Sequence, residues 1–191
     1  MRLGGAILAA GASRRLGQPK QLVLLAGEAL VRRMARLARE AGCDHVAVVL
    51  GCQGPQVAAA LQGIPCELLD NPGWAEGVAA SVRCAVQWAD REGCDALMVL
   101  VCDQLNVSVA HLSQLWAAWR AAPDAPVASA YAGTLGVPAI FARADYPELL
   151  QLQGDQGAAR LLRGGQRRVT QLAWPEGEAD LDTPDDLAKL D

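Results

Sequence analysis

The sequence predicts a single α/β domain built on a doubly wound, mostly parallel sheet with helices on its two faces. Short apolar runs alternate with longer segments of helical periodicity through the first half of the chain, which is the pattern of βαβ units. One run, Ala96–Cys102, is apolar throughout, as expected for a strand buried on both faces. A chain of 191 residues is long enough for one such core and short for two, so we expect one domain over residues 1–191.

The individual elements follow from these runs in chain order. Six short apolar segments have the length of strands: Gly4–Ala9, His45–Leu50, Cys66–Leu69, Ala96–Cys102, Pro126–Ala130 and Pro138–Phe141. Four longer segments have helical spacing: Ala29–Glu40, Gln53–Leu61, Glu76–Arg91 and Ser108–Ala121. The region from residue 130 to 165 is richer in Gly and has shorter elements, so we expect it to cover the open edge of the sheet.

Composition and charge exclude several classes of protein. A net charge of −4 argues against a nucleic-acid partner, because such proteins usually carry a basic surface. The longest apolar run is far shorter than the roughly 18 residues that a membrane span needs, so we expect no membrane partner. The apolar stretch after Arg2 ends at Arg14 and Arg15, where a signal peptide would have its cleavage site. The six cysteines form no CxxC pair, which favours reduced thiols in a cytoplasmic protein.

The loop after the first strand has the composition of a phosphate-binding segment. Small residues follow a buried strand, so backbone N–H groups are available at the carboxyl edge of the sheet. Neither GxGxxG nor GxxxxGK[ST] occurs, which excludes a dinucleotide fingerprint and a P-loop. Only two of the 17 Lys and Arg residues are lysines, Lys20 and Lys189, so a lysine in this loop suggests a need for a compact positive charge. An ordinary surface position for Lys20 is the alternative.

Three later segments carry further candidates. Asp103 directly follows the most hydrophobic run, where a carboxylate would face the same crevice as the first loop and could bind Mg²⁺ or cap the next turn. Gly77 and Ser81 lie in a turn that leads into a helix, where small residues allow a planar base to approach, unless the turn is a plain helix entry with Trp74 in the core. Thr183 is placed to cap a C-terminal helix, which leaves Asp180 and Asp182 before it unexplained.

Taken in order, these segments resemble the motifs of the molybdopterin nucleotidyltransferase (MobA-like) family over essentially the full length. The first loop resembles LAAGxSxRxGxPK, which is typical of the cytidylyltransferase branch, whereas the guanylyltransferase branch reads LAGG. The other similar segments start at Asn71 (NPxWxxGxxxSLR), Asp103 (DQP), Gly133 (GxxGxP), Gly154 (GDxGAR) and Asp180 (DIDTPEDL). The departures are Leu16 for Met, Val82 for Leu, Leu105 for Pro, Val137 for a frequent His, and one extra alanine before Arg160.

The resemblance implies a Rossmann-like nucleotidyltransferase fold and a role for each matching residue. The implied nucleotide-binding residues are Leu8, Ala9, Ala10, Gly11, Ser13, Arg15, Lys20, Gly77, Ser81 and Asp103. The implied catalytic residues are Lys20, Arg15 and Asp103, and the implied Mg²⁺ ligands are Asp103 and Asp182. The implied acceptor-binding residues are Gly136, Pro138 and Asp155.

The expected activity is Mg²⁺-dependent transfer of CMP from CTP to the phosphate of molybdopterin, with release of pyrophosphate. The attacking phosphate is already ionised at neutral pH, so no general base is needed, and His45 and His111 are expected to be structural. A molybdoenzyme or its chaperone is the implied partner for the product. Two alternatives stay open, namely a guanylyl- or sugar-phosphate nucleotidyltransferase of the same fold and a non-catalytic module that binds nucleotide or cofactor. Pyrophosphate release and a screen of acceptors would separate them.

Overall fold

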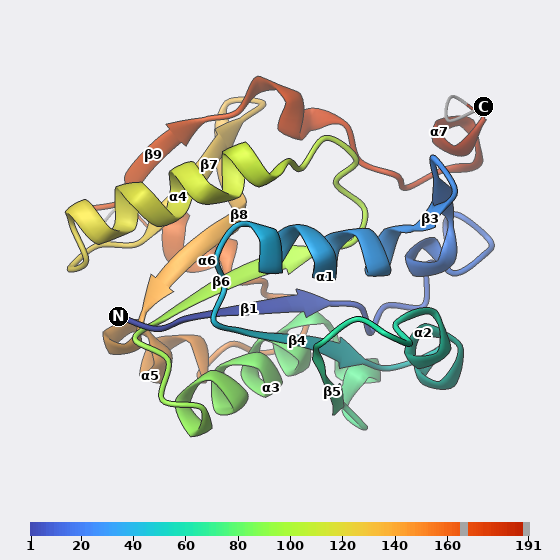
Figure 1. Ribbon diagram of the computed structural model, residues 1–191, viewed down its shortest axis with the longest axis horizontal. Coiled ribbons are helices and arrows are strands. Elements are labelled where there is room, and N and C mark those ends of the chain that lie inside the picture. Colours follow the sequence, from blue (N-terminus) through green and yellow to red (C-terminus); the bar gives the residue numbers. More distant parts are fainter. Residues whose placement is uncertain (165–167, 189–191) are drawn as a thin grey trace.

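The computed structural model describes residues 1–164 and 168–188, which form a seven-stranded sheet with helices on both faces (Figure 1). The strands of this sheet are β1 (Leu3–Leu8), β4 (His45–Leu50), β5 (Glu67–Asp70), β6 (Ala96–Val101), β7 (Val127–Tyr131), β8 (Thr134–Ala142) and β9 (Thr170–Ala173). The helices are α1 (Leu30–Glu40), α2 (Gly54–Ala60), α3 (Val78–Arg91), α4 (Val109–Ala121), α5 (Tyr146–Leu149), α6 (Ala159–Arg163) and α7 (Pro184–Leu187). In the part of the chain described, no helix is long and apolar enough to cross a membrane.

The core has two layers because the sheet is covered on each face. One layer contains the apolar faces of α1 and α4, with Leu30, Met34 and Leu112 packed against the sheet. The other contains α3, α5 and α6, where Trp88 and Phe141 are buried. β1 and β6 are buried almost from end to end, as a strand covered on both sides must be.

The strand order β5-β4-β1-β6-β8-β7-β9 places a topological switch point at the centre of the sheet. β1 pairs in parallel with β4 on one side and with β6 on the other. The chain leaves β1 toward β4 and β5 and returns to the opposite side as β6. In such sheets the loops that follow the two central strands diverge and leave a crevice at the carboxyl edge, where ligands bind. The loops after β1 and β6 contain Lys20 and Asp103, two of the residues singled out in the sequence.

The prediction of a mostly parallel sheet is confirmed, but the prediction that residues 130 to 165 cover its open edge is partly wrong. β8 is antiparallel to both β6 and β7 and lies between them, so part of the segment expected to cover the open edge is instead a strand of the sheet. β8 is also longer than the predicted Pro138–Phe141. Its first half was not predicted because Gly136 and Pro138 are residues that rarely occur within strands. β9 was not predicted, since its side chains are alternately half-buried and exposed and its sequence is only weakly hydrophobic.

Two smaller differences lie close to the first loop and the third helix. A two-stranded hairpin, β2 (Leu24–Leu25) with β3 (Glu28–Ala29), follows the first loop and was not predicted. The helix expected from Glu76 begins at Val78, after a short 3-10 turn over Trp74–Glu76. Gly77 has φ of +127°, a value outside the helical region, and this separates the turn from the helix.

All six cysteines are free thiols, as the sequence predicts. Cys43, Cys94 and Cys102 are buried in the core, where cysteine packs as a small hydrophobe. Burial raises the pKa of the Cys43 thiol to about 12, so it stays protonated at neutral pH.

Candidate functional site

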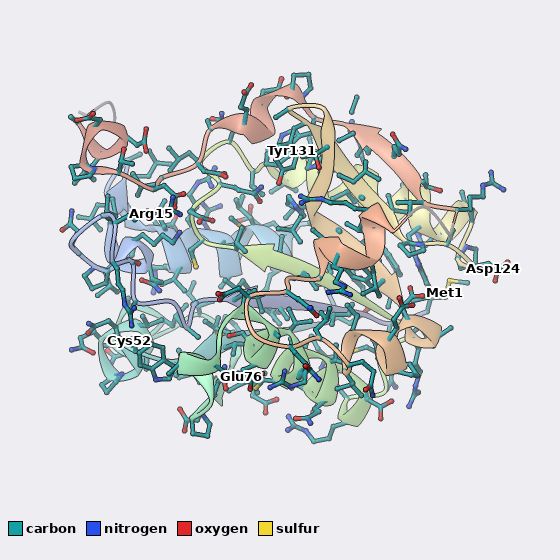
Figure 2. The ribbon with its side chains drawn as sticks, turned by 180° about the vertical axis from the view of Figure 1, so that it is seen from behind. Met1, Arg15, Cys52, Glu76, Asp124 and Tyr131 are labelled. Carbon is teal, nitrogen blue, oxygen red and sulfur yellow. The ribbon has the colours of Figure 1, made fainter. Side chains whose placement is uncertain are left out.

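The first loop leaves β1 at the carboxyl edge of the sheet, and the segment that follows β4 hydrogen-bonds to it. The amide of Cys52 donates to the carbonyl oxygen of Ala10 at 3.1 Å. Gly51 must be glycine here, because a Cβ at this position would lie 2.5 Å from the same carbonyl oxygen. Arg15 and Cys52, which follow β1 and β4, lie at the same end of the molecule (Figure 2). The sequence pattern pointed to the loop but not to this support.

A cluster of two cations and two carboxylates lies beside this loop. The Nζ of Lys20 contacts Oδ2 of Asp103 and lies 3.3 Å from Oδ1 of Asp182. A guanidinium nitrogen of Arg15 donates to Oδ2 of Asp182 at 2.8 Å. The side chains of Lys20 and Asp103 are only 22% and 18% exposed, so their contact is partly shielded from water. Four residues from three separate motifs therefore meet at one point.

Backbone pairing explains how Asp182 reaches Asp103. Gln104 forms an isolated antiparallel bridge with Asp180. The amide of Leu181 donates to the carbonyl oxygen of Asp103 at 3.0 Å, and the amide of Leu105 donates to that of Ala179 at 3.3 Å. The side chain of Leu181 is fully buried and anchors the segment.

Leu105 stands where the family motif has proline, and its amide takes part in this pairing. Proline has no N–H and could not donate this hydrogen bond. Beyond the bridge, the Oγ1 of Thr183 accepts from the amide of Asp186 at 3.3 Å and caps α7, as expected from the sequence.

The electrostatics of the cluster keep Lys20 charged. Burial, the largest single effect, lowers the pKa of the Lys20 ammonium, but the charges and hydrogen bonds of Asp103 and Asp182 together outweigh it and the pKa is raised. The pKa of the neighbouring Asp180 carboxyl is raised to about 6, because partial burial and the negative charges of Asp103 and Asp182 disfavour its ionised form. The site therefore holds a permanent cation between two carboxylates.

A cavity of about 490 Å³ opens between the first loop, the end of β6 and the start of α3. It is lined by Leu8, Ala10, Gly11, Ala12, Ser13, Arg14, Lys20, Gln21, Trp74, Ala75, Glu76, Gly77, Val78, Ser81, Val101, Cys102, Asp103 and Asp155. Of the expected nucleotide-binding residues, Ala9 and Arg15 are not in this lining, since Ala9 is buried behind the loop and Arg15 is paired with Asp182 at the rim. Trp74 is half-buried and both lines the cavity and packs on the core.

Asp155 lines the same cavity because the turn that contains it packs against the start of α3. The amide of Ala79 donates to the carbonyl oxygen of Gly154 at 3.0 Å. A Cβ at Gly77 would lie 2.4 Å from that oxygen, so Gly77 is required both by its positive φ and by this close approach. Ser81, expected to face a base, is 4% exposed, and its hydroxyl accepts from the Asn71 side chain at 3.1 Å.

Gly136 and Pro138, expected at the acceptor, lie buried in β8 and do not line the cavity. Their segment contacts the residue after Asp103 instead, because the side-chain amide of Gln104 donates to the carbonyl oxygen of Val137 at 2.8 Å. The hydroxyl of Ser129 donates to the carbonyl oxygen of Pro138 at 2.6 Å and fixes the strand from the other side. This segment therefore supports the loop after β6.

The donor set fits a hard divalent cation held jointly with phosphate. Asp103 and Asp182 both contact one ammonium group, so their oxygens are within reach of a common cation. Within residues 1–164 and 168–188, no group of three or more His, Cys, Asp and Glu could hold a metal by itself. Mg²⁺ is commonly bound by one or two carboxylates, with phosphate oxygens and water completing the shell. This arrangement matches that pattern.

Gln21 is a site residue that the sequence analysis missed. It follows Lys20 in the 3-10 turn Lys20–Leu22 and is 2% exposed. Its side-chain amide donates to the carbonyl oxygens of Ala9 and Gly11 at 2.9 and 2.7 Å. A polar side chain between Lys20 and an apolar run was the only available signal in the sequence.

The fold agrees with comparisons to known proteins. Residues 5–171 match the model of the MobA-like NTP transferase domain. The chain is 33% identical over 95% of its length to purine catabolism protein PucB of Bacillus subtilis (strain 168), of which it covers 92%. It is 32% identical over its whole length to the molybdenum cofactor guanylyltransferase of Rhodobacter capsulatus, of which it covers 96%.

Solved structures share the fold. The structure of Rv0371c from Mycobacterium tuberculosis H37Rv matches with a TM-score of 0.85 and 31% identity, covering 100% of this chain and 97% of that one. A structure of Rv0371c in complex with manganese matches with a TM-score of 0.82 and 28% identity, covering 100% of this chain and 98% of that one. The chain belongs to the MobA-like NTP transferase family and is a nucleotidyltransferase.

Proposed function

We propose that this enzyme transfers CMP from CTP to the terminal phosphate of molybdopterin, with Mg²⁺ as its metal ion and pyrophosphate as the second product. The observation that carries the proposal is the contact of Lys20 with both Asp103 and Asp182 at the edge of the cavity. The relative named molybdenum cofactor guanylyltransferase supports the acceptor class, and the structure titled as a manganese complex supports a divalent metal.

In this proposal each charged residue has one task. Asp103 and Asp182 hold Mg²⁺, which when bound supplies positive charge to the phosphates. Lys20 turns from the carboxylates toward the triphosphate and stabilises the charge that develops on the leaving group, and Arg15 does the same from the rim. Permanent cations suit this task, since neither needs to exchange a proton.

The reaction needs positioning rather than acid–base catalysis. An oxygen of the acceptor phosphate attacks the α-phosphorus, the bond from that phosphorus to the bridging oxygen breaks, and pyrophosphate leaves with the electron pair. Both phosphate groups are ionised at neutral pH, so no proton must be removed from the nucleophile. Catalysis then depends on alignment and charge neutralisation.

The choice of CTP rests on Ala9 and Ala10, where the guanylyltransferase branch has LAGG. Ala10 lines the cavity and is 4% exposed, so it is the position at which the two branches differ in the wall of the site. We expect Ala10→Gly to narrow the preference for CTP over GTP by roughly 10-fold, because a methylene-sized change in a pocket alters discrimination by about that factor. The product would pass in the cytoplasm to a molybdoenzyme or its chaperone.

The test is pyrophosphate release by the purified enzyme with Mg²⁺ and molybdenum-loaded molybdopterin, comparing CTP, GTP, ATP and UTP. Release with CTP alone supports the proposal. Release with GTP or another NTP overturns the base assignment and keeps the acceptor. Release with a sugar phosphate in place of molybdopterin overturns the proposed acceptor. Saturable NTP binding without turnover on active acceptor overturns the catalytic role.

A further inference from the structure

Gln21 makes an unusual number of contacts with the first loop for a single side chain. Its amide nitrogen donates to the carbonyl oxygens of Ala9 and Gly11 at 2.9 and 2.7 Å. Its amide oxygen accepts from the hydroxyl of Ser13 at 3.4 Å. That hydroxyl in turn accepts from the backbone amide of Lys20 at 3.1 Å. One buried side chain thus ties three alternate residues of the loop to the turn that carries Lys20.

These contacts fix the direction of two peptide groups. In a trans peptide the carbonyl and the next N–H point in opposite directions. The only cis peptide bond in the described residues is Val137–Pro138, so the peptides after Ala9 and Gly11 are trans. Because Gln21 binds these two carbonyl oxygens, the N–H groups of Ala10 and Ala12 point away from the Gln21 amide.

The N–H groups turned outward in this way are available to a ligand. In the ranges 1–164 and 168–188, no hydrogen bond uses the N–H of residues 10 to 13 as donor. Ala10 and Ala12 both line the cavity beside Lys20. Backbone N–H groups that line a concave loop without protein acceptors form an anion-binding site, in which phosphate oxygens replace water.

We infer that Gln21 is a positioning residue that holds the first loop with the Ala10 and Ala12 N–H groups directed at the triphosphate. It acts through the loop and does not itself need to contact the substrate. The inference rests on the proposed function only in that the ligand is a metal-bound NTP, whichever base and acceptor the enzyme uses. Loss of the Gln21 contacts should therefore weaken nucleotide binding more than it slows the bound enzyme.

The direct test is Gln21→Glu, which keeps the shape of the side chain and removes both donors. It would place carboxylate oxygens against the carbonyl oxygens of Ala9 and Gly11. We expect the Kd for Mg²⁺–NTP, measured by calorimetry, to rise about 10-fold or more, as for the loss of buried hydrogen bonds to the backbone. The turnover number at saturating nucleotide should fall much less. Gln21→Met removes the donors without adding charge and should raise Kd in the same direction.

Two controls separate positioning from charge and from general destabilisation. Gln18→Glu adds the same charge at an exposed position of the same loop. Tyr146→Phe removes a buried hydroxyl that donates to the carbonyl oxygen of Cys94, away from the cavity. A Kd close to that of the wild type in both Gln21 variants, or an equal rise in Tyr146→Phe at matched loss of thermal stability, overturns the inference. If Kd rises in the Gln21 variants as expected but the wild-type enzyme shows no turnover with molybdopterin, only the proposed acceptor is overturned.

Discussion

The ammonium nitrogen of Lys20 lies 3.3 Å from Oδ1 of Asp182, although the two residues are 162 positions apart in the sequence. The same ammonium contacts Asp103, so a cation of the protein lies between the two carboxylates proposed to hold the metal. A metal ion and Lys20 therefore compete for the same oxygens. The phosphates of a bound nucleotide would resolve this competition, because they give Lys20 an alternative partner.

The first prediction concerns this competition. In Lys20→Met, Mn²⁺ should bind to the enzyme without nucleotide roughly 10-fold more tightly than in the wild type, because Asp103 and Asp182 lose the ammonium group that lies between them. Turnover should be lost in the same variant. Mn²⁺ affinity can be followed by electron paramagnetic resonance of the free ion. Arg120→Met, which removes a distant charge on α4, is the control, and weaker Mn²⁺ binding in Lys20→Met would contradict the competition.

The second prediction concerns Asp103. Asp103→Asn should lower turnover by a factor of about 100 or more, since it removes charged oxygen ligation for the metal. The fold should be retained, because Leu181 bonds to the backbone oxygen of Asp103 and not to its side chain. Pyrophosphate release and circular dichroism measure the two effects. Asp185→Asn, an exposed change in α7, should have wild-type turnover, and unchanged turnover in Asp103→Asn would refute the metal assignment.

The third prediction concerns the departure at Leu105. Leu105→Pro restores the residue of the family motif but removes the N–H that donates to Ala179. We expect a loss of about 1 kcal/mol in the free energy of unfolding and a higher Mg²⁺ requirement, because the segment carrying Asp182 is held less firmly. Leu105→Ala keeps the N–H and should have the wild-type Mg²⁺ requirement. Denaturant unfolding and metal titration of turnover check both variants.

The fourth prediction concerns Gly77. Gly77→Ala would place a Cβ 2.4 Å from the carbonyl oxygen of Gly154, so the turn with Asp155 must move away from α3. The two nearest atoms, the carbonyl oxygen and carbon of Gly154, belong to the backbone and have little freedom to move. A loss of about 2 kcal/mol in the free energy of unfolding is expected together with a higher KM for nucleotide. Gly73→Ala, next to the same turn, is the matched control, because a Cβ there would make only ordinary contacts, the nearest at 3.5 Å from the side-chain oxygen of Asn71. Equal effects in the two variants would argue against the close approach.

The fifth prediction concerns pH and His111. This side chain is buried, bonds to Ser129 at 2.8 Å and stacks on Trp174 with ring centroids 4.6 Å apart. Burial lowers its pKa to about 4, although the negative charge of Glu176 acts in the opposite direction. Between the ordinary pKa of about 6.5 and this value, only the unfolded chain binds the proton, so the free energy of unfolding falls as the pH falls.

The size of this effect is roughly 3 kcal/mol between pH 6.5 and pH 4, since each pKa unit corresponds to about 1.4 kcal/mol. The measurement is denaturant unfolding at several pH values for the wild type and for His111→Gln. The variant should lose less stability over this range, although it starts less stable. Parallel curves for the two proteins would show that His111 contributes nothing to the pH dependence.

The sequence predicted the parallel half of the sheet well, because its strands are buried on both faces and read as apolar runs. Ala96–Cys102 and His45–Leu50 correspond to β6 and β4 almost residue for residue. β8 and β9 were harder, since their pairing depends on partners far away in the chain. Gly136 and Pro138 are poor strand formers on local grounds, and only tertiary contacts keep them in β8.

The site residues could be predicted from the sequence where their position relative to a neighbouring strand is recognisable. Lys20 and Asp103 lie in the segments that follow β1 and β6, two strands that a parallel sheet must bring to one edge. The convergence of Asp182 on them came from resemblance alone, because the bridge between Gln104 and Asp180 has no local signature. Gln21 and Gly51 were missed for the same reason, since each acts on the backbone of another segment.

The bridge between Gln104 and Asp180 also bears on how the protein is made. During translation, the strands β1, β4, β5 and β6 and the loop with Lys20 leave the ribosome long before Asp182 does. A nascent chain can therefore assemble most of its nucleotide cavity while it carries one of the two carboxylates. If both carboxylates hold the metal as proposed, such a chain lacks one of its two ligands, and activity begins only once the segment with Asp182 has paired with Gln104.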